Sequence, residues 1–148
     1  MSLLAAIRPD DWNLALFVHV LGAMLLVGAL VLVLVALAGR DMRLGFRALL
    51  FGVLPGWVVM RAGAQWIASK EGYDEGDVPA WVDLGFIVSD PLLLFLIIAT
   101  VCAGIATRRE RRDAAVSGGG LRSVALVLAG IMLVACVVAI WAMTTKPT

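Results

Sequence analysis

Residues 14–38 read LALFVHVLGAMLLVGALVLVLVALA, a run of 25 residues in which His19 is the only ionisable side chain. At about 1.5 Å of rise per residue, a helix of this length crosses a hydrocarbon core about 30 Å thick. The run is too long for the apolar part of a signal peptide, and Asp10 and Asp11 precede it rather than a basic segment. We therefore expect a membrane span that is retained in the mature protein.

Three further apolar runs follow the first one. The four predicted spans cover about residues 12–38, 46–68, 84–107 and 122–143. Because lipid offers no water to backbone groups, each span is predicted to be a helix. The two-residue alternation of a membrane barrel is absent. The sequence thus predicts an all-α polytopic membrane protein, a single domain over residues 1–148 with four transmembrane helices in an antiparallel bundle.

The composition excludes several other classes of protein. Apolar residues make up 62% of the chain and charged residues 16%, and the mean hydropathy is +1.00. Soluble domains contain about 45–50% apolar residues, so a soluble enzyme domain and a disordered tail are excluded. A net charge of +1 gives no field that attracts nucleic acid. Cys102 and Cys136 lie inside apolar runs without a Cys-x-x-Cys motif, which is typical of small packing residues.

The distribution of basic residues predicts the orientation of the spans. Basic loops remain cytoplasmic, so the connections between spans one and two and between spans three and four are predicted to be cytoplasmic. Both termini and the acidic connection 69–80 are then extracytoplasmic. The eight basic residues of the cytoplasmic connections are Arg40, Arg43, Arg47, Arg108, Arg109, Arg111, Arg112 and Arg122, against Arg8, Lys70 and Lys146 on the other side.

Tryptophans support this orientation, because their amphipathic rings favour the membrane interface. Four of the five fall at the predicted outer ends of spans, as interface anchors: Trp12, Trp66, Trp81 and Trp141. We expect a multi-pass protein of the bacterial plasma (inner) membrane, with the lipid bilayer as its first partner. The ten arginines against two lysines agree with a bacterial source of high GC content.

Three ionisable side chains lie in the interior of the predicted spans, and Gln65 adds a neutral polar group there. An ionisable group in lipid is costly and therefore suggests a function. His19, Arg61 and Asp90 are each about 8–14 Å below the outer tryptophans at helical rise, and Gln65 shares a helix face with Arg61. We expect an Arg61–Asp90 ion pair with His19 or Gln65 bonded nearby. This cluster is a candidate ligand or proton site, and the alternative is that it only holds the helices in register.

Small residues accompany His19 on its face of the first span. Gly22 and Ala23 are one turn away, and small residues let helices approach closely in membranes. We therefore assign Gly22 and Ala23 to structural packing.

The pair Asp90-Pro91 leaves the start of the third helix open. Asp followed by Pro is typical of an N-cap and a first helical residue, which would begin the helix at Asp90 and leave 81–89 as a separate segment. The alternative is one continuous helix that Pro91 kinks.

Few residues of this chain suit a cofactor or a catalytic role. A bis-histidine haem needs two axial histidines and this chain has one, although Met24, Met60, Met143 or the His19 of a second copy could supply the other ligand. No Cys/His/Met cluster suits a transition metal, and no Ser-His-Asp set is present. We expect no metal site, no catalytic residues and no enzyme activity, with haem b as a minor alternative.

The first span resembles a known family at Phe17-Val18-His19-Val20-Leu21-Gly22-Ala23. This segment is similar to the opening of the DUF2269-type small integral membrane proteins, which are bacterial four-span proteins distantly similar to the membrane domains of copper-resistance D proteins. The end of the chain, 141–147, resembles that family's close, a span followed by Lys-Pro. The resemblance implies the four-span plan and no mechanism, and the copper association does not carry over because only His19 matches a potential ligand.

Three functional hypotheses follow. The first is a non-enzymatic accessory or structural subunit that associates with itself or with a larger membrane complex, without nucleic acid. The second is a transporter or proton-coupled carrier with an intramembrane site at His19, Arg61 and Asp90. The third is a haem- or quinone-binding electron-transfer subunit.

Overall fold

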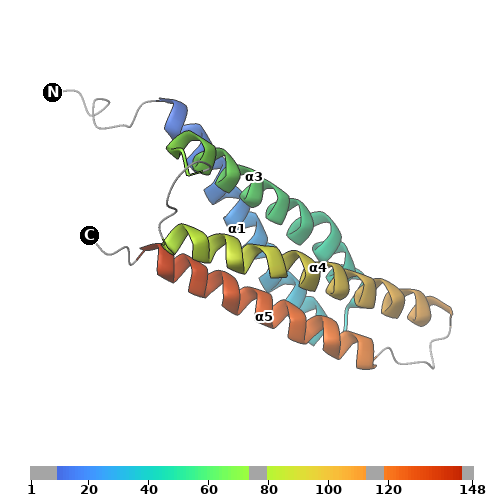
Figure 1. The fold of residues 1–148 in the computed structure, drawn as a ribbon. Coiled ribbons are helices and arrows are strands. Elements are labelled where there is room, and N and C mark those ends of the chain that lie inside the picture. The colour runs from blue at the N-terminus through green and yellow to red at the C-terminus, as the bar shows by residue number, and fades with distance from the viewer. Residues whose placement is uncertain (1–9, 74–79, 113–118, 145–148) are drawn as a thin grey trace.

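Helices form nearly all of the described chain. The computed structural model describes residues 10–73, 80–112 and 119–144, without the side chains of 10–13, 80, 81 and 84. The elements are α1 (Asp10–Ala38), α2 (Met42–Ala48), the π-helical segment η2 (Leu49–Val53), α3 (Leu54–Glu71), α4 (Ala80–Arg112) and α5 (Gly119–Thr144) (Figure 1). Of the described residues, 96% are helical.

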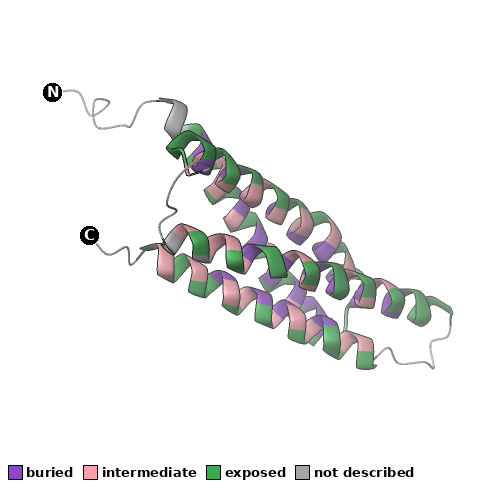
Figure 2. Cartoon of the chain, viewed as in Figure 1, coloured by how far each residue is buried: buried purple, intermediate pink, exposed green. Residues whose placement is uncertain are grey.

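Four helical stretches are long and apolar enough to cross a membrane, as the sequence predicted. They are Leu14–Ala38, Met42–Glu71, Gly85–Arg112 and Gly119–Thr144. Apolar side chains cover the outward faces: Met24 is 69% exposed and Phe51 is 74% exposed. Buried residues follow the lines along which the helices meet (Figure 2). A surface of this kind suits lipid and would be a liability in water.

The closest helix contact joins α1 to α3 through glycine. A Cβ atom on Gly56 would lie 2.7 Å from the backbone nitrogen of Leu26, and one on Gly63 would lie 2.6 Å from that of His19. At Gly22 the added atom would overlap the backbone of Met60. Later positions in α3 thus meet earlier positions in α1, so the two helices run in opposite directions. In lipid such contact holds helices by van der Waals packing, because lipid tails are as apolar as leucine.

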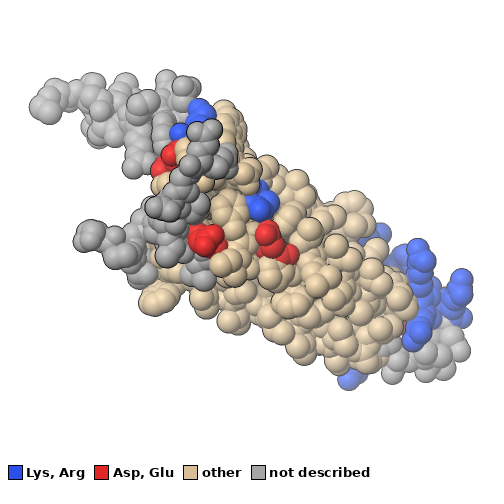
Figure 3. Space-filling view, in the orientation of Figure 1, with Lys and Arg blue, Asp and Glu red and all other residues tan. Residues whose placement is uncertain are grey.

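The largest buried side chains gather in one half of the molecule. They come from the second half of α1, from α2 and η2, and from the middle of α4 and α5; the set is Leu30, Val33, Leu37, Met42, Leu49, Val53, Leu96 and Met132. In this half α1 also packs against α5, and α2 packs against α4. The Thr107 hydroxyl donates to the Met42 carbonyl at 3.2 Å, which joins α4 to α2. We call this half the Arg-rich half, because basic side chains cluster at its end (Figure 3), and those residues are arginines.

The turn between α1 and α2 is short and specific. Arg40 has a φ of 65°, a left-handed conformation that costs a non-glycine residue roughly 1–2 kcal/mol. The Asp41 amide then donates to the Ala36 carbonyl at 2.8 Å. The Asp41 carboxylate accepts from the Leu44 amide at 2.9 Å, which caps α2. This turn sends the chain straight back along α1.

The second span contains a π-helical segment that the sequence analysis did not anticipate. Pro55 has no N–H, and in a regular α-helix its ring would clash with the carbonyl of the residue four positions earlier. The Leu54 amide bonds to the Leu49 carbonyl, which is the five-residue spacing of a π-helix. The segment lets the second span pass Pro55 without a break.

The third span settles the choice left open at Asp90-Pro91. Helix α4 begins at Ala80 and continues through Pro91 to Arg112. The interpretation of Asp90 as the N-cap of the third span, with 81–89 as a separate segment, is therefore wrong. A helix that ended inside a hydrocarbon core would leave several backbone N–H and C=O groups without hydrogen-bond partners. Each such group costs several kcal/mol in lipid. This cost exceeds the gain of about 0.5–2 kcal/mol from a cap.

The glycine contact between α1 and α3 gives a direct test of the packing. Gly22→Leu should lower the free energy of unfolding in detergent micelles by about 1–3 kcal/mol or more, because the side chain meets backbone that cannot yield. Gly28→Leu is the matched control on the same helix, since nothing lies within 4 Å of an added Cβ there. It should change stability by less than about 0.5 kcal/mol. Equal losses in the two variants would contradict the contact.

Candidate functional site

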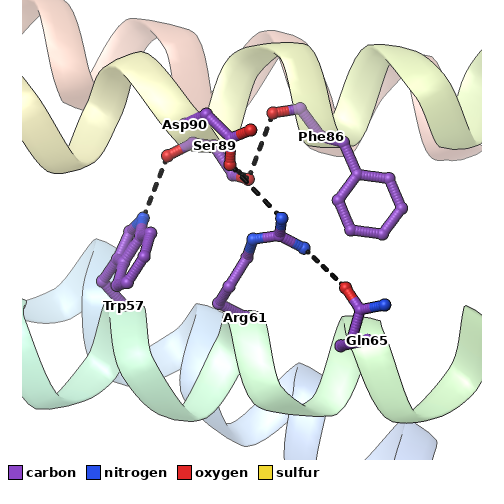
Figure 4. A network of polar contacts seen from close by, with 6 residues as sticks. All are labelled: Trp57, Arg61, Gln65, Phe86, Ser89 and Asp90. Atoms are coloured by element: carbon purple, nitrogen blue, oxygen red, sulfur yellow. Dashed lines mark hydrogen bonds and ion pairs between the residues drawn. The ribbon is translucent and has the colours of Figure 1, made fainter.

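Side chains rather than backbone contact join α3 to α4 in the half opposite the Arg-rich half. The backbones of α3 and α4 approach each other at few positions. Trp57, Arg61 and Gln65 come from α3, and Phe86, Ser89 and Asp90 come from α4 (Figure 4). We call these six residues the polar bridge.

Arg61 is the centre of the polar bridge. Its Nη2 lies 3.3 Å from Asp90 Oδ1, which is an ion pair. Its Nη1 donates to Gln65 Oε1 at 3.3 Å, one helical turn further from the Arg-rich end. The guanidinium also lies over the Phe86 ring, 4.3 Å from the ring centroid, where the face of the ring attracts a cation. The structure thus brings together Arg61, Gln65 and Asp90, as the sequence suggested.

Trp57 and Ser89 extend the bridge to the backbone of α4. The Trp57 indole Nε1 donates to the Ser89 carbonyl at 3.1 Å, and the Ser89 hydroxyl donates to the Phe86 carbonyl at 3.3 Å. These bonds lie just before Pro91, which has no N–H and leaves the carbonyl four residues earlier without its helical partner. That carbonyl belongs to Ile87, whereas the two bonds of the bridge go to the neighbouring carbonyls of Ser89 and Phe86. The bridge therefore joins α3 to α4 beside the interruption.

Asp90 is not enclosed by the bridge. Its side chain is 65% exposed, whereas that of Arg61 is 26% exposed. Its contacts with the Arg61 guanidinium and with the Ser89 hydroxyl, at 3.3 Å and 3.4 Å, both use Oδ1. Among the described residues, Oδ2 has no hydrogen-bond partner. A carboxylate that is half open at this position was not foreseen from the sequence, because periodicity does not say how far a helix face is covered.

His19 lies apart from the other candidate residues. Its Nδ1 is 2.9 Å from the Met60 carbonyl on α3. Because a carbonyl only accepts, Nδ1 carries the hydrogen of this bond. The expectation that His19 or Gln65 is bonded near the ion pair thus holds for Gln65, whereas His19 bonds to the backbone of α3. The structure places His19 at the glycine contact beside Gly63, together with Gly22.

The anchors and the remaining candidates are placed only in part. Trp66 is 39% exposed and Trp141 is 65% exposed, and the Lys70 ammonium lies 5.8 Å from the Trp66 ring centroid. The side chains of Trp12 and Trp81 lie outside the described residues. Ala23 is half-buried on α1, and Cys102 and Cys136 are free thiols.

Within residues 10–73, 80–112 and 119–144, no three His, Cys, Asp or Glu side chains form a group that could hold a metal ion. Sequence reasoning also missed Trp57 and Phe86 as partners in the bridge, and it missed the glycines of the second span. The glycines could have been recognised from the sequence, because Gly45, Gly52, Gly56 and Gly63 are spaced by seven, four and seven residues.

Comparisons with protein-family models, curated proteins and solved structures found no match to this chain.

A double-mutant cycle tests the ion pair. Arg61→Leu and Asp90→Leu should each destabilise the protein, because each leaves an opposite charge unpaired. The double change should recover part of the loss, with a coupling energy of about 0.5–3 kcal/mol, measured by unfolding in bicelles. Asp83, which is exposed on α4, provides a control pair. Arg61→Leu and Asp83→Leu should be additive. Strict additivity at Arg61 and Asp90 as well would contradict the pairing.

Proposed function

We propose that this chain is a small non-enzymatic membrane subunit of the DUF2269 type, which assembles with other membrane-spanning chains. In this proposal the four apolar helices form an antiparallel bundle in a bacterial plasma membrane. The observation that carries the proposal is the exposed carboxylate of Asp90 within a membrane-length helix. Such a group needs a cover that the described part of this chain does not supply.

The Arg-rich end gives the reference for the depth of this carboxylate. Positive loops remain cytoplasmic, so we place the Arg-rich end at the cytoplasmic face and both termini outside. Asp90 lies eighteen residues before Arg108, which is about 27 Å along the helix. A hydrocarbon core about 30 Å thick then holds Asp90 just inside its outer boundary, which is nearer to that boundary than the depth expected from the outer tryptophans. Arg61 lies deeper, about 21 Å from Arg47, and its guanidinium points outward toward Gln65.

The energetics favour another polypeptide as the cover. A charged side chain in the membrane costs up to about 2.5–3.5 kcal/mol on insertion scales, and less near the boundary. The bond to Arg61 offsets part of this cost, but the Asp90 side chain stays 65% exposed and its Oδ2 has no partner among the described residues. Polar groups between transmembrane helices act as glue, because the partner helix supplies hydrogen bonds that lipid cannot. An accessory or self-associating subunit accounts for such a group without any catalytic set.

The cofactor proposals follow from the number of histidines. We propose no resident haem, because a bis-histidine haem needs two axial histidines and this chain has one. We likewise propose no metal, no enzyme activity and no nucleic-acid partner. The bilayer and a second membrane chain are the proposed partners.

The carrier hypothesis has one observation in its favour, which is that an exposed Asp90 would also suit a water-filled path. A pair of measurements separates the two functions. Native mass spectrometry from nanodiscs should give a mass greater than that of one 15.7 kDa chain. Proteoliposomes containing the protein should show no proton flux. A proton flux that Asp90→Asn abolishes, with a single chain per nanodisc, would overturn the accessory role in favour of the carrier.

A further inference from the structure

One face of α4 carries the exposed carboxylate in a regular apolar stripe. Ile87, Asp90, Leu94, Ile97 and Val101 follow one another at alternating spacings of three and four residues. The four apolar members are between 50% and 62% exposed. We call these five residues the α4 stripe. Its spacing is that of a coiled-coil seam, in which each side chain fits between four residues of a facing helix.

The charge on the stripe narrows the choice of partner. Asp90 and Arg61 together are neutral, so a partner with a lone lysine or arginine would bring an uncompensated charge to the same place. Two kinds of group in this pair remain available to a partner chain. They are one carboxylate oxygen of Asp90 and N–H groups of the Arg61 guanidinium, which has five donors in all. These groups are complementary to each other. A second neutral pair of the same kind satisfies both without adding net charge.

We propose that the α4 stripe is the interface of a homodimer in which the Arg61–Asp90 pairs of two copies join into one ring of four charges. This proposal rests on the assembly function above and names its partner as a second copy of this chain. Two copies inserted in the same direction place their Asp90 residues at the same depth, as a twofold axis along the membrane normal requires. The guanidinium of each copy then donates to the free Oδ2 of the other copy's Asp90.

The ring removes the problem that each copy has alone. Two carboxylates near a twofold axis would repel each other if they were bare, but each already has a guanidinium within 3.3 Å. The charges alternate in sign around the ring, so each charge is attracted by its two neighbours. Asp83, seven residues before Asp90 on the same helix, lies beyond the outer end of the stripe, where water and salt screen its charge. The apolar members below the ring supply the close packing.

Disulfide cross-linking in native membranes tests the interface. Single cysteines at Ile87, Leu94 and Val101 are placed in a background that carries Cys102→Ala and Cys136→Ala. Each should give a covalent dimer on mild oxidation, because equivalent stripe positions meet across the twofold axis. Val134→Cys on α5 is the matched control. It is 63% exposed but lies on a different helix, and it should remain monomeric.

The charge ring has its own test in the same system. Asp90→Asn keeps the size of the side chain and removes its charge. It should reduce the dimer fraction of Leu94→Cys at a fixed protein-to-lipid ratio, with a dissociation constant that rises about threefold to thirtyfold. Ile98→Val, an exposed position on α4 outside the stripe, should leave the dissociation constant unchanged.

The outcomes separate this inference from the function on which it rests. Cross-links at the stripe that weaken with Asp90→Asn support the homodimer. A dimer that cross-links only through Val134 overturns the α4 interface and leaves self-association in place. A stoichiometric complex with a different chain and no homodimer overturns the inference but keeps the accessory role. A monomer with a proton flux through Asp90 overturns both.

Discussion

The contact between the backbones of α1 and α3 determines how the rest of the molecule is arranged. Gly22, Gly56 and Gly63 let the two helices approach until backbone meets backbone, and this contact fixes the rotation of α3 about its own axis. With the glycine face against α1, Trp57 and Arg61 lie on another face, from which they reach α4. A bulkier residue in the contact would shift the polar bridge along with the helix. The position of the charged pair therefore depends on residues that have no polar chemistry.

The two halves of the molecule are held by different forces. Large apolar side chains and the Thr107 hydrogen bond join the helices in the Arg-rich half. In the other half, the indole, the guanidinium and the Phe86 ring connect α3 to α4 across a distance that the backbones do not close. In lipid, where hydrophobic burial contributes little between helices, such polar contacts carry a larger share of the attraction. An ion pair with one open side is then suited to extend that attraction to another chain.

Much of the fold could be predicted from the sequence, because each span is longer and more apolar than soluble helices allow. The pairing of Arg61 with Asp90 and the bond from Arg61 to Gln65 were also predictable, since depth along each helix follows from residue number. The start of α4 could not be predicted in the same way. A helix cap at Asp-Pro contributes less free energy than the backbone hydrogen bonds that a continuous helix keeps across the span. The π-helical segment, the separate position of His19 and the exposure of Asp90 depend on helix rotation. A single sequence determines rotation only where its small residues reveal the contact face.

The central claim is that protein, rather than lipid or water, covers the open side of the Arg61–Asp90 pair. A nitroxide spin label attached at Ile87→Cys, one turn from Asp90, tests this claim in bilayers through its collisions with oxygen and with a water-soluble nickel chelate. The account predicts that both collision rates are low at Ile87, while a label at Val134 on α5 collides frequently with oxygen. Frequent oxygen collisions at Ile87 would show a lipid-facing pair, and frequent nickel collisions would show a water-filled path. Either result would contradict the account.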